Sequence, residues 1–196
     1  MPLQLPRPIS YPITNGRTTS QTIPDVLRFI QGVVTAQLPL VQIREKSLPA
    51  RVLYDLTARA VEITRDTKTR LLVNDRVDIA RPAGADGVHL TAHSLPADVV
   101  REIGGPDFLI GVSTHSLAEA RAAQVAGADF VVFGPIFETE SKRAFGAPQG
   151  LDKLREVTLA LGEFPVLAIG GITRENTASC IEAGASGIAG ISLFER

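Results

Sequence analysis

The feature that most constrains the fold is a regular alternation of short apolar runs with longer segments of helical pattern. The runs are rich in Val, Ile, Leu and Phe, and the segments between them repeat apolar residues at helical spacing. Continuous apolar strands that alternate with helices indicate a parallel sheet covered on both faces. The eight runs are residues 9–14, 38–43, 69–73, 86–90, 108–113, 129–134, 164–170 and 186–192.

Eight such units in 196 residues predict an α/β fold, a (β/α)8 TIM barrel of parallel strands. The repeats AGADG, AGADF and AGASG support it, because each places Gly at a helix end shortly before the next strand. Only four residues follow the last run, so the eighth helix is expected to be short or missing. An open doubly wound sheet is the alternative, although TNGRTT after the first run is a poor match to its glycine-rich turn. We predict one barrel domain over residues 1–196.

The composition is that of an ordinary globular protein, with 44% apolar and 21% charged residues. A formal net charge of −1 gives no reason to expect a basic surface for nucleic acid or anionic membrane. The single cysteine, Cys180, excludes an internal disulfide. No signal peptide or transmembrane run is visible, so a cytoplasmic protein is expected.

In such a barrel the functional residues lie at the carboxyl ends of the strands, and the residues collected there indicate an anion site. Arg44 and Lys46 flank Glu45, so in an extended segment both cations point to the same side. The pair Gly170-Gly171 offers backbone N–H groups before a helix, which suits phosphate. Asp75 beside a polyphosphate is where Mg²⁺ would be held. The same ends also present Gln42, Asn74, Ser113, Thr139, Ser141, Lys142, Ile191 and Ser192.

Each of these signals also has a purely structural explanation. VQIREK could be a solvated loop, and Asn74-Asp75 could be a turn or a helix N-cap. A Gly pair often only permits a tight turn. His89 is expected to pack inside the barrel with its polar atoms satisfied.

Five ordered motifs resemble those of the thiamine phosphate synthase and thiazole tautomerase superfamily. They are VQIREK, NDRVDIA with GADGVHL, IGVSTHS, GADFVVFGPIF and AIGGI, over roughly residues 40–193. The synthase branch joins a hydroxymethylpyrimidine diphosphate to a thiazole phosphate, or its carboxylate, and releases pyrophosphate. The resemblance implies a pyrimidine and diphosphate site of Gln42, Arg44, Lys46, Asn74, Ser113 and Lys142, with Mg²⁺ on Asp75. It implies a thiazole phosphate site of Thr139, Ser141, Gly170, Gly171, Ile191 and Ser192, and a possible homodimer.

One departure leaves alternatives open. After GVHL the synthase pattern reads Gly-Gln-Asp-Asp-Leu-Pro, whereas this chain reads Thr-Ala-His-Ser-Leu-Pro, with His93 at the second magnesium carboxylate. Imidazole is a poor ligand for this hard cation. The metal-free thiazole tautomerase is therefore an alternative, although Pro135 stands where that branch carries a histidine. A further alternative is a non-catalytic thiazole phosphate binder on the same fold.

Overall fold

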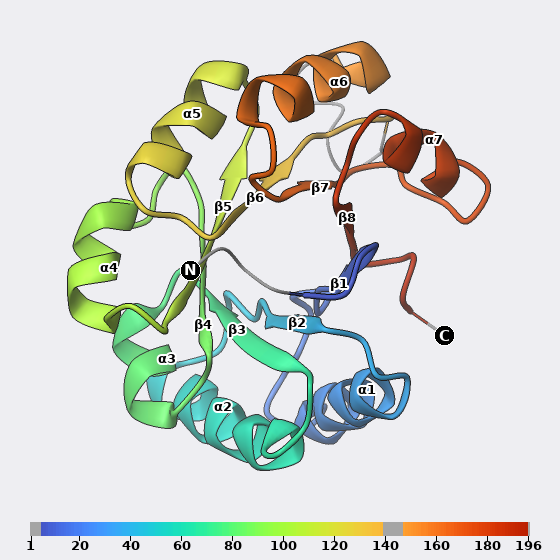
Figure 1. The fold of residues 1–196 in the computed structure, drawn as a ribbon. Coiled ribbons are helices and arrows are strands. Elements are labelled where there is room, and N and C mark those ends of the chain that lie inside the picture. Colours follow the sequence, from blue (N-terminus) through green and yellow to red (C-terminus); the bar gives the residue numbers. More distant parts are fainter. Residues whose placement is uncertain (1–4, 139–146, 196) are drawn as a thin grey trace.

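Eight parallel strands form the centre of the molecule, with helices around them (Figure 1). The computed structural model describes residues 5–138 and 147–195. The sheet order is β1-β8-β7-β6-β5-β4-β3-β2, and the bridge between Ile13 and Gln42 links its two edges. The predicted (β/α)8 barrel is therefore confirmed, and the open doubly wound sheet is wrong. The strands are β1 (Ile9–Pro12), β2 (Leu40–Ile43), β3 (Arg70–Asn74), β4 (Gly87–Leu90), β5 (Leu109–Thr114), β6 (Phe130–Phe133), β7 (Val166–Ala168) and β8 (Gly187–Gly190).

Seven helices cover the outside of the barrel in the described ranges, and none of them is long and apolar enough to cross a membrane. Turns follow β8, and no helix is found between Gly190 and Glu195, as expected for an eighth helix that is short or missing. The helices are α1 (Ile23–Thr35), α2 (Ala50–Thr64), α3 (Val77–Ala83), α4 (Ala97–Gly104), α5 (Leu117–Val125), α6 (Gly150–Leu161) and α7 (Thr177–Glu182).

Local sequence explains where individual helices begin and end. α5 begins after Ser116, whose Oγ accepts the Glu119 N–H at 3.2 Å, while Glu119 Oε2 accepts the His115 N–H at 2.7 Å. The first bond satisfies a donor that the first helical turn cannot pair internally, and the second satisfies the N–H of the residue before the N-cap. α3 ends at Gly84, which adopts φ +81°, a left-handed conformation that glycine adopts without steric cost.

The apolar side chains form two layers. One lies between the helices and the strands and includes Ile43, Leu56 and Val73. The other fills the barrel interior and includes Tyr11, Leu72 and Phe130. Because side chains of a strand alternate between its faces, residues two apart share the interior. This alternation turns Gln42 inward with Leu40, and Asn74 inward with Leu72.

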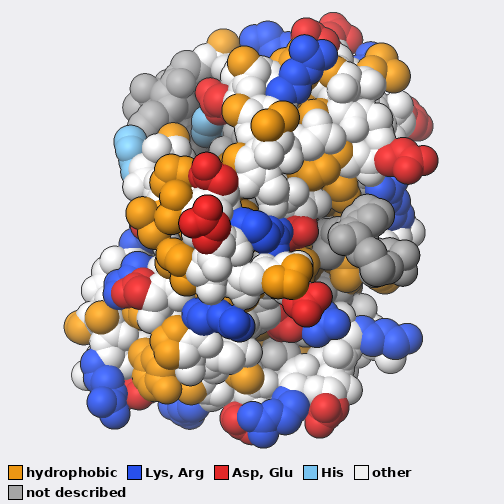
Figure 2. Space-filling view, turned by 60° about the vertical axis from the view of Figure 1, so that its left-hand side comes forward, with side chains coloured by type: hydrophobic (Ala, Val, Ile, Leu, Met, Phe, Trp, Pro, Cys, Tyr) orange, Lys and Arg blue, Asp and Glu red, His pale blue; other side chains and the backbone are white. Residues whose placement is uncertain are grey.

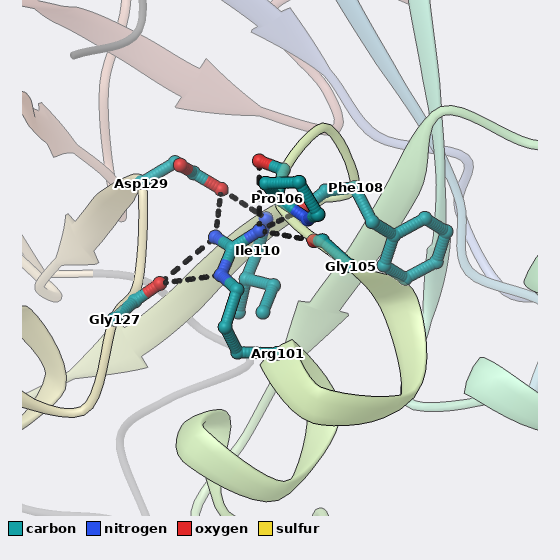
Figure 3. Close-up of polar contacts among 7 residues, drawn as sticks. All are labelled: Arg101, Gly105, Pro106, Phe108, Ile110, Gly127 and Asp129. Carbon is teal, nitrogen blue, oxygen red and sulfur yellow. Dashed lines mark hydrogen bonds and ion pairs between the residues drawn. The ribbon is translucent and has the colours of Figure 1, made fainter. Parts of the chain in front are cut away.

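The amino-terminal end of the barrel is tied together by carboxylates from the repeated AGAD segments. Asp129 Oδ2 accepts the Ile110 N–H and the Arg101 Nη2–H, both at 2.7 Å, and Arg101 also donates to the Gly127 carbonyl at 2.9 Å (Figure 3). Asp86 acts similarly one repeat earlier, where its Oδ2 accepts the Leu71 N–H at 2.8 Å. The repeats thus secure the end of the barrel opposite to the predicted site.

Candidate functional site

Four polar side chains from different strands converge near the carboxyl end of the barrel interior. We call Tyr11, Gln42, His89 and Ser113 the inner polar cluster. Tyr11 and His89 have ring centroids 5.7 Å apart, and His89 Nε2 lies 2.9 Å from Ser113 Oγ. Tyr11 Oη, Gln42 Nε2 and His89 Nδ1 are buried without a hydrogen-bond partner among the described residues. Buried polar atoms are normally paired, so this cluster is suited to a polar ligand.

His89 remains a neutral imidazole at physiological pH. Burial lowers its pKa from 6.5 to about 3, and the nearby positive charge of Arg44 adds to the effect. Gly111 leaves room for the ring, because a methyl group there would lie 2.8 Å from His89 Nδ1 and 2.4 Å from Phe130 Cζ. The expectation that His89 is buried is confirmed, but the expectation that its polar atoms are all satisfied is wrong for Nδ1.

Arg44 follows Gln42 by two residues and lies at the barrel mouth. Its backbone N–H donates to Thr14 Oγ1 at 2.8 Å. Its guanidinium lies against Gly16, where an added methyl group would approach Nη1 to 3.1 Å. Lys46 lies elsewhere, in a cavity with Asp75. The two cations therefore serve different parts of the mouth.

The second region is a cavity of about 230 Å³ formed by the loops after β2, β3 and β4. Its lining includes Lys46, Asn74, Asp75, Thr91 and His93. A cation, an amide, a carboxylate and an imidazole are thus brought together from segments far apart in sequence. These groups are suited to a charged ligand.

Two neighbouring aspartates after β3 have different roles. Asp78 is engaged by Arg76, whose Nε and Nη2 donate to its two oxygens at 2.8 and 2.6 Å. Asp75 adopts φ +64°, and its carboxylate forms no hydrogen bond or ion pair with any described residue. The free carboxylate of Asp75 is therefore available to a ligand of the cavity.

The third region lies after β7 and β8, which are adjacent strands. Within the described ranges, no residue accepts a hydrogen bond from the backbone N–H groups of Gly170 or Gly171. Gly171 also fits closely against the loop after β6, since a methyl group on Gly171 would lie 2.7 Å from both Glu138 O and Phe137 Cβ. Ile191 and Ser192 follow β8 directly. These features suit an anion held by backbone N–H groups.

The predicted residues Thr139, Ser141 and Lys142 lie outside the described residues. Sequence reasoning missed Tyr11 as a candidate, because it stands in an apolar run and only barrel closure places its hydroxyl in the interior. It also missed Glu45, which is 2% exposed. Its position between two cations gave no sign that the carboxylate would be buried.

Comparisons with known proteins decide the family. A family model described as thiamine monophosphate synthase matches residues 10–194. The chain belongs to the thiamine monophosphate synthase family. It is 43% identical over 166 residues to the thiamine-phosphate synthase of Moorella thermoacetica, covering 85% of this chain and 79% of that protein. It is 41% identical over 188 residues to the thiamine-phosphate synthase of Roseiflexus sp., covering 94% and 77%.

A solved structure agrees with these relatives. Thiamine phosphate pyrophosphorylase from Pyrococcus furiosus superposes with a TM-score of 0.77 at 32% identity. The match covers 94% of this chain and 85% of that one. The resemblance inferred from the motifs is therefore confirmed, as is its assignment to transferases of thiamine biosynthesis.

Proposed function

We propose that this chain synthesises thiamine phosphate by joining hydroxymethylpyrimidine diphosphate to thiazole phosphate, with release of pyrophosphate. The bond between the pyrimidine methylene carbon and the diphosphate oxygen breaks, and a bond from the thiazole nitrogen to that carbon forms. The observation that carries the proposal is the inner polar cluster, with its unpaired atoms, lying below Arg44 in a chain of the synthase family.

The inner polar cluster is suited to the pyrimidine. A pyrimidine ring carries nitrogen atoms that accept hydrogen bonds, and its amino group donates them. Gln42 Nε2 can donate, and Tyr11 Oη and His89 Nδ1 complete a set of polar atoms without partners among the described residues. Ser113 adds its hydroxyl. Because His89 stays neutral, it places no positive charge beside the cation that develops on the methylene carbon.

Cations at the mouth of the barrel are assigned to stabilise the negative charge of the leaving diphosphate. Arg44 offers a planar fork of donors and Lys46 a point charge. Asn74 shares the cavity of Lys46. Such a departure depends on neutralising the leaving group and excluding water, and it requires no protein nucleophile. On the basis of the sequence, Lys142 is proposed as a third cation.

The described residues of this site supply only part of the ligands that Mg²⁺ needs. In the described part of the chain, no three His, Cys, Asp or Glu side chains are grouped for one metal ion. Asp75 is a free carboxylate in the cavity, and Mg²⁺ is commonly held by one or two carboxylates together with substrate phosphates. Asp75 and the Asn74 amide oxygen would therefore hold a magnesium ion that arrives with the diphosphate. When bound, the ion would supply positive charge to the leaving group.

The thiazole phosphate is assigned to the turns after β7 and β8. The open N–H groups of Gly170 and Gly171 support this assignment, and the backbone after Ile191 and Ser192 is adjacent. On the basis of the sequence, Thr139 and Ser141 are proposed as further hydrogen-bond donors to the phosphate. This arrangement holds the thiazole at the mouth while the pyrimidine occupies the interior.

We also propose that the chain acts in the cytoplasm as a homodimer. Val99 and Ile103 lie four residues apart on α4 and are 38% and 50% exposed, and Leu95, just before the helix, is 50% exposed. Three exposed apolar side chains in this segment suit a surface that packs on a partner. Figure 2 brings the side of α3, α4 and α5 forward and shows hydrophobic side chains grouped among charged ones. Light scattering should give twice the chain mass, and Val99→Asp should reduce it to the monomer mass.

A turnover experiment tests the proposed function. Purified protein is incubated with pyrimidine diphosphate, thiazole phosphate and Mg²⁺, and thiamine phosphate and pyrophosphate are measured. Both products should form in equal amounts. A parallel sample holds the thiazole carboxylate phosphate alone and is assayed for isomerisation. Isomerisation without thiamine phosphate would replace the synthase with the tautomerase, and binding without either product would leave a non-catalytic binder.

A further inference from the structure

Glu45 is a buried carboxylate that binds backbone N–H groups. Its Oε2 accepts the Thr18 N–H at 3.0 Å, and its Oε1 accepts the Gly16 N–H at 3.4 Å. Although Arg44 and Lys46 are its neighbours in sequence, Glu45 forms no salt bridge with a described residue. Burying a carboxylate is costly unless hydrogen bonds compensate for the lost hydration. The loop between β1 and α1 supplies those bonds.

The same loop contacts Arg44. Gly16 adopts φ +76°, and its Cα faces both the guanidinium and the carbonyl oxygen of Arg44, which an added methyl group would approach to 3.1 and 3.2 Å. Thr14 ties the start of the loop to β2, because its N–H donates to the Gln42 carbonyl at 3.0 Å and its Oγ1 accepts the Arg44 N–H at 2.8 Å. The loop is thus attached at Thr14 and Thr18, on either side of Gly16, which both binds Glu45 and contacts Arg44.

We infer that Glu45 is a positioning residue for the diphosphate site, because it holds the β1–α1 loop against Arg44 and so fixes the guanidinium at the barrel mouth. The inference rests on the proposed function for the role of Arg44 toward diphosphate. Glu45 also lines the cavity of Lys46 and Asp75, so the double variant below separates a direct effect on the diphosphate from an effect through Arg44. Backbone N–H groups bind its carboxylate, and no described carboxylate forms a salt bridge with Arg44, whose charge is therefore available to an anion.

Amide hydrogen exchange tests the attachment of the loop without any substrate. Glu45→Gln keeps the size of the side chain but replaces one acceptor oxygen with a donor, so one of the two N–H groups loses its partner. The amide that loses its acceptor, Thr18 or Gly16, should exchange about tenfold faster, as expected for losing one charge-assisted hydrogen bond. Glu62→Gln, at an exposed side chain of α2, is the matched control and should leave both amides unchanged. Unchanged exchange of both Thr18 and Gly16 in Glu45→Gln would overturn the inference.

Pyrophosphate binding, measured by calorimetry, tests whether the loop acts through Arg44. Arg44→Ala should weaken binding by about tenfold to a hundredfold. Glu45→Gln should weaken it by a smaller factor, about threefold to tenfold. Adding Glu45→Gln to Arg44→Ala should cause no further loss, because the effects of coupled residues are not additive. A full additional loss in the double variant would show that Glu45 acts independently of Arg44 and would overturn the inference.

A second variant separates positioning from simple loss of folding. Glu45→Asp keeps the charge but shortens the reach, and it should shift Thr18 exchange and pyrophosphate affinity in the same direction as Glu45→Gln. A merely structural role would reduce the folded fraction and leave the Kd of that fraction unchanged, which would also overturn the inference. Wild-type protein that binds pyrophosphate but makes no thiamine phosphate would reject the proposed function alone. Wild-type protein that binds no pyrophosphate would reject both.

Discussion

His89 Nε2 lies 2.9 Å from Ser113 Oγ, and this hydrogen bond joins β4 to β5 inside the barrel. The bond belongs to a histidine whose pKa is lowered to about 3, first by burial and second by the charge of Arg44. At acidic pH the unfolded chain therefore binds a proton on this histidine that the folded protein does not bind, and this proton stabilises the unfolded state. This difference in proton binding links the inner polar cluster to the stability of the barrel.

The first prediction is that acid destabilises the protein through His89. Unfolded histidine binds a proton near pH 6.5, whereas folded His89 does so only near pH 3, so stability is lost as the pH falls from about 6.5 towards 3. The loss approaches about 1.4 kcal/mol per pH unit. Urea unfolding at pH 7 and pH 5 should show a larger decrease for wild type than for His89→Gln. Equal decreases would contradict the assigned protonation state.

The second prediction concerns Gly171, compared with Gly84. Both have positive φ values, +65° and +81°, but an added methyl group at Gly84 would meet only Val61 Cγ1, at 3.7 Å. Gly84→Ala should cost about 1 kcal/mol for the left-handed backbone conformation alone. Gly171→Ala should cost about 1–3 kcal/mol more because it displaces the loop at Phe137 and Glu138, and it should also weaken binding of inorganic phosphate. Urea unfolding and calorimetry measure the two effects.

The third prediction concerns the amino-terminal end of the barrel. Arg101→Met removes the bonds to Asp129 and to the carbonyls of Gly105, Phe108 and Gly127. We expect a loss of about 2–3 kcal/mol in the free energy of unfolding, because hydrogen bonds to charged groups are strong and their partners are left unpaired. Arg101→Lys keeps the charge without the fork and should lose part of this stability. Turnover of the folded protein should stay at the wild-type rate in both variants.

The sequence was most informative where the signal is local. Runs of Val, Ile and Leu predict strands such as β2 and β6, because only a sheet covered on both faces buries every residue of a run. The ends of those strands then follow from the barrel topology, which brings Gln42, Asn74 and Ser113 to one end. The burial of Glu45 could not be predicted, because it depends on N–H groups nearly thirty residues earlier in the chain. Tyr11 could not be predicted for a similar reason, since its hydroxyl reaches the candidate site only when the barrel closes.

The fourth prediction compares Asp75 with Asp78, which differ in their partners although they are three residues apart. Asp75→Asn removes the free carboxylate of the cavity while keeping its shape. Synthase turnover should fall more than about tenfold, and a higher Mg²⁺ concentration should be needed to recover it. Asp78→Asn removes only an exposed ion pair with Arg76 and should change stability by less than about 1 kcal/mol. Equal turnover in the two variants at limiting Mg²⁺ would show that Asp75 belongs to a turn and not to a metal site.

The last prediction reverses the departure at His93, which lines the same cavity as Asp75. His93→Asp supplies a second carboxylate, and Mg²⁺ prefers oxygen ligands to imidazole. In the presence of pyrophosphate, Mg²⁺ titrated by calorimetry should bind more tightly to His93→Asp than to wild type. Titration of His93→Asn separates the effect of charge from the loss of imidazole, because Asn adds an oxygen without a negative charge. If His93→Asp and His93→Asn bind Mg²⁺ as wild type does, the side chain at position 93 takes no part in holding the cation, and Asp75 acts alone with the diphosphate.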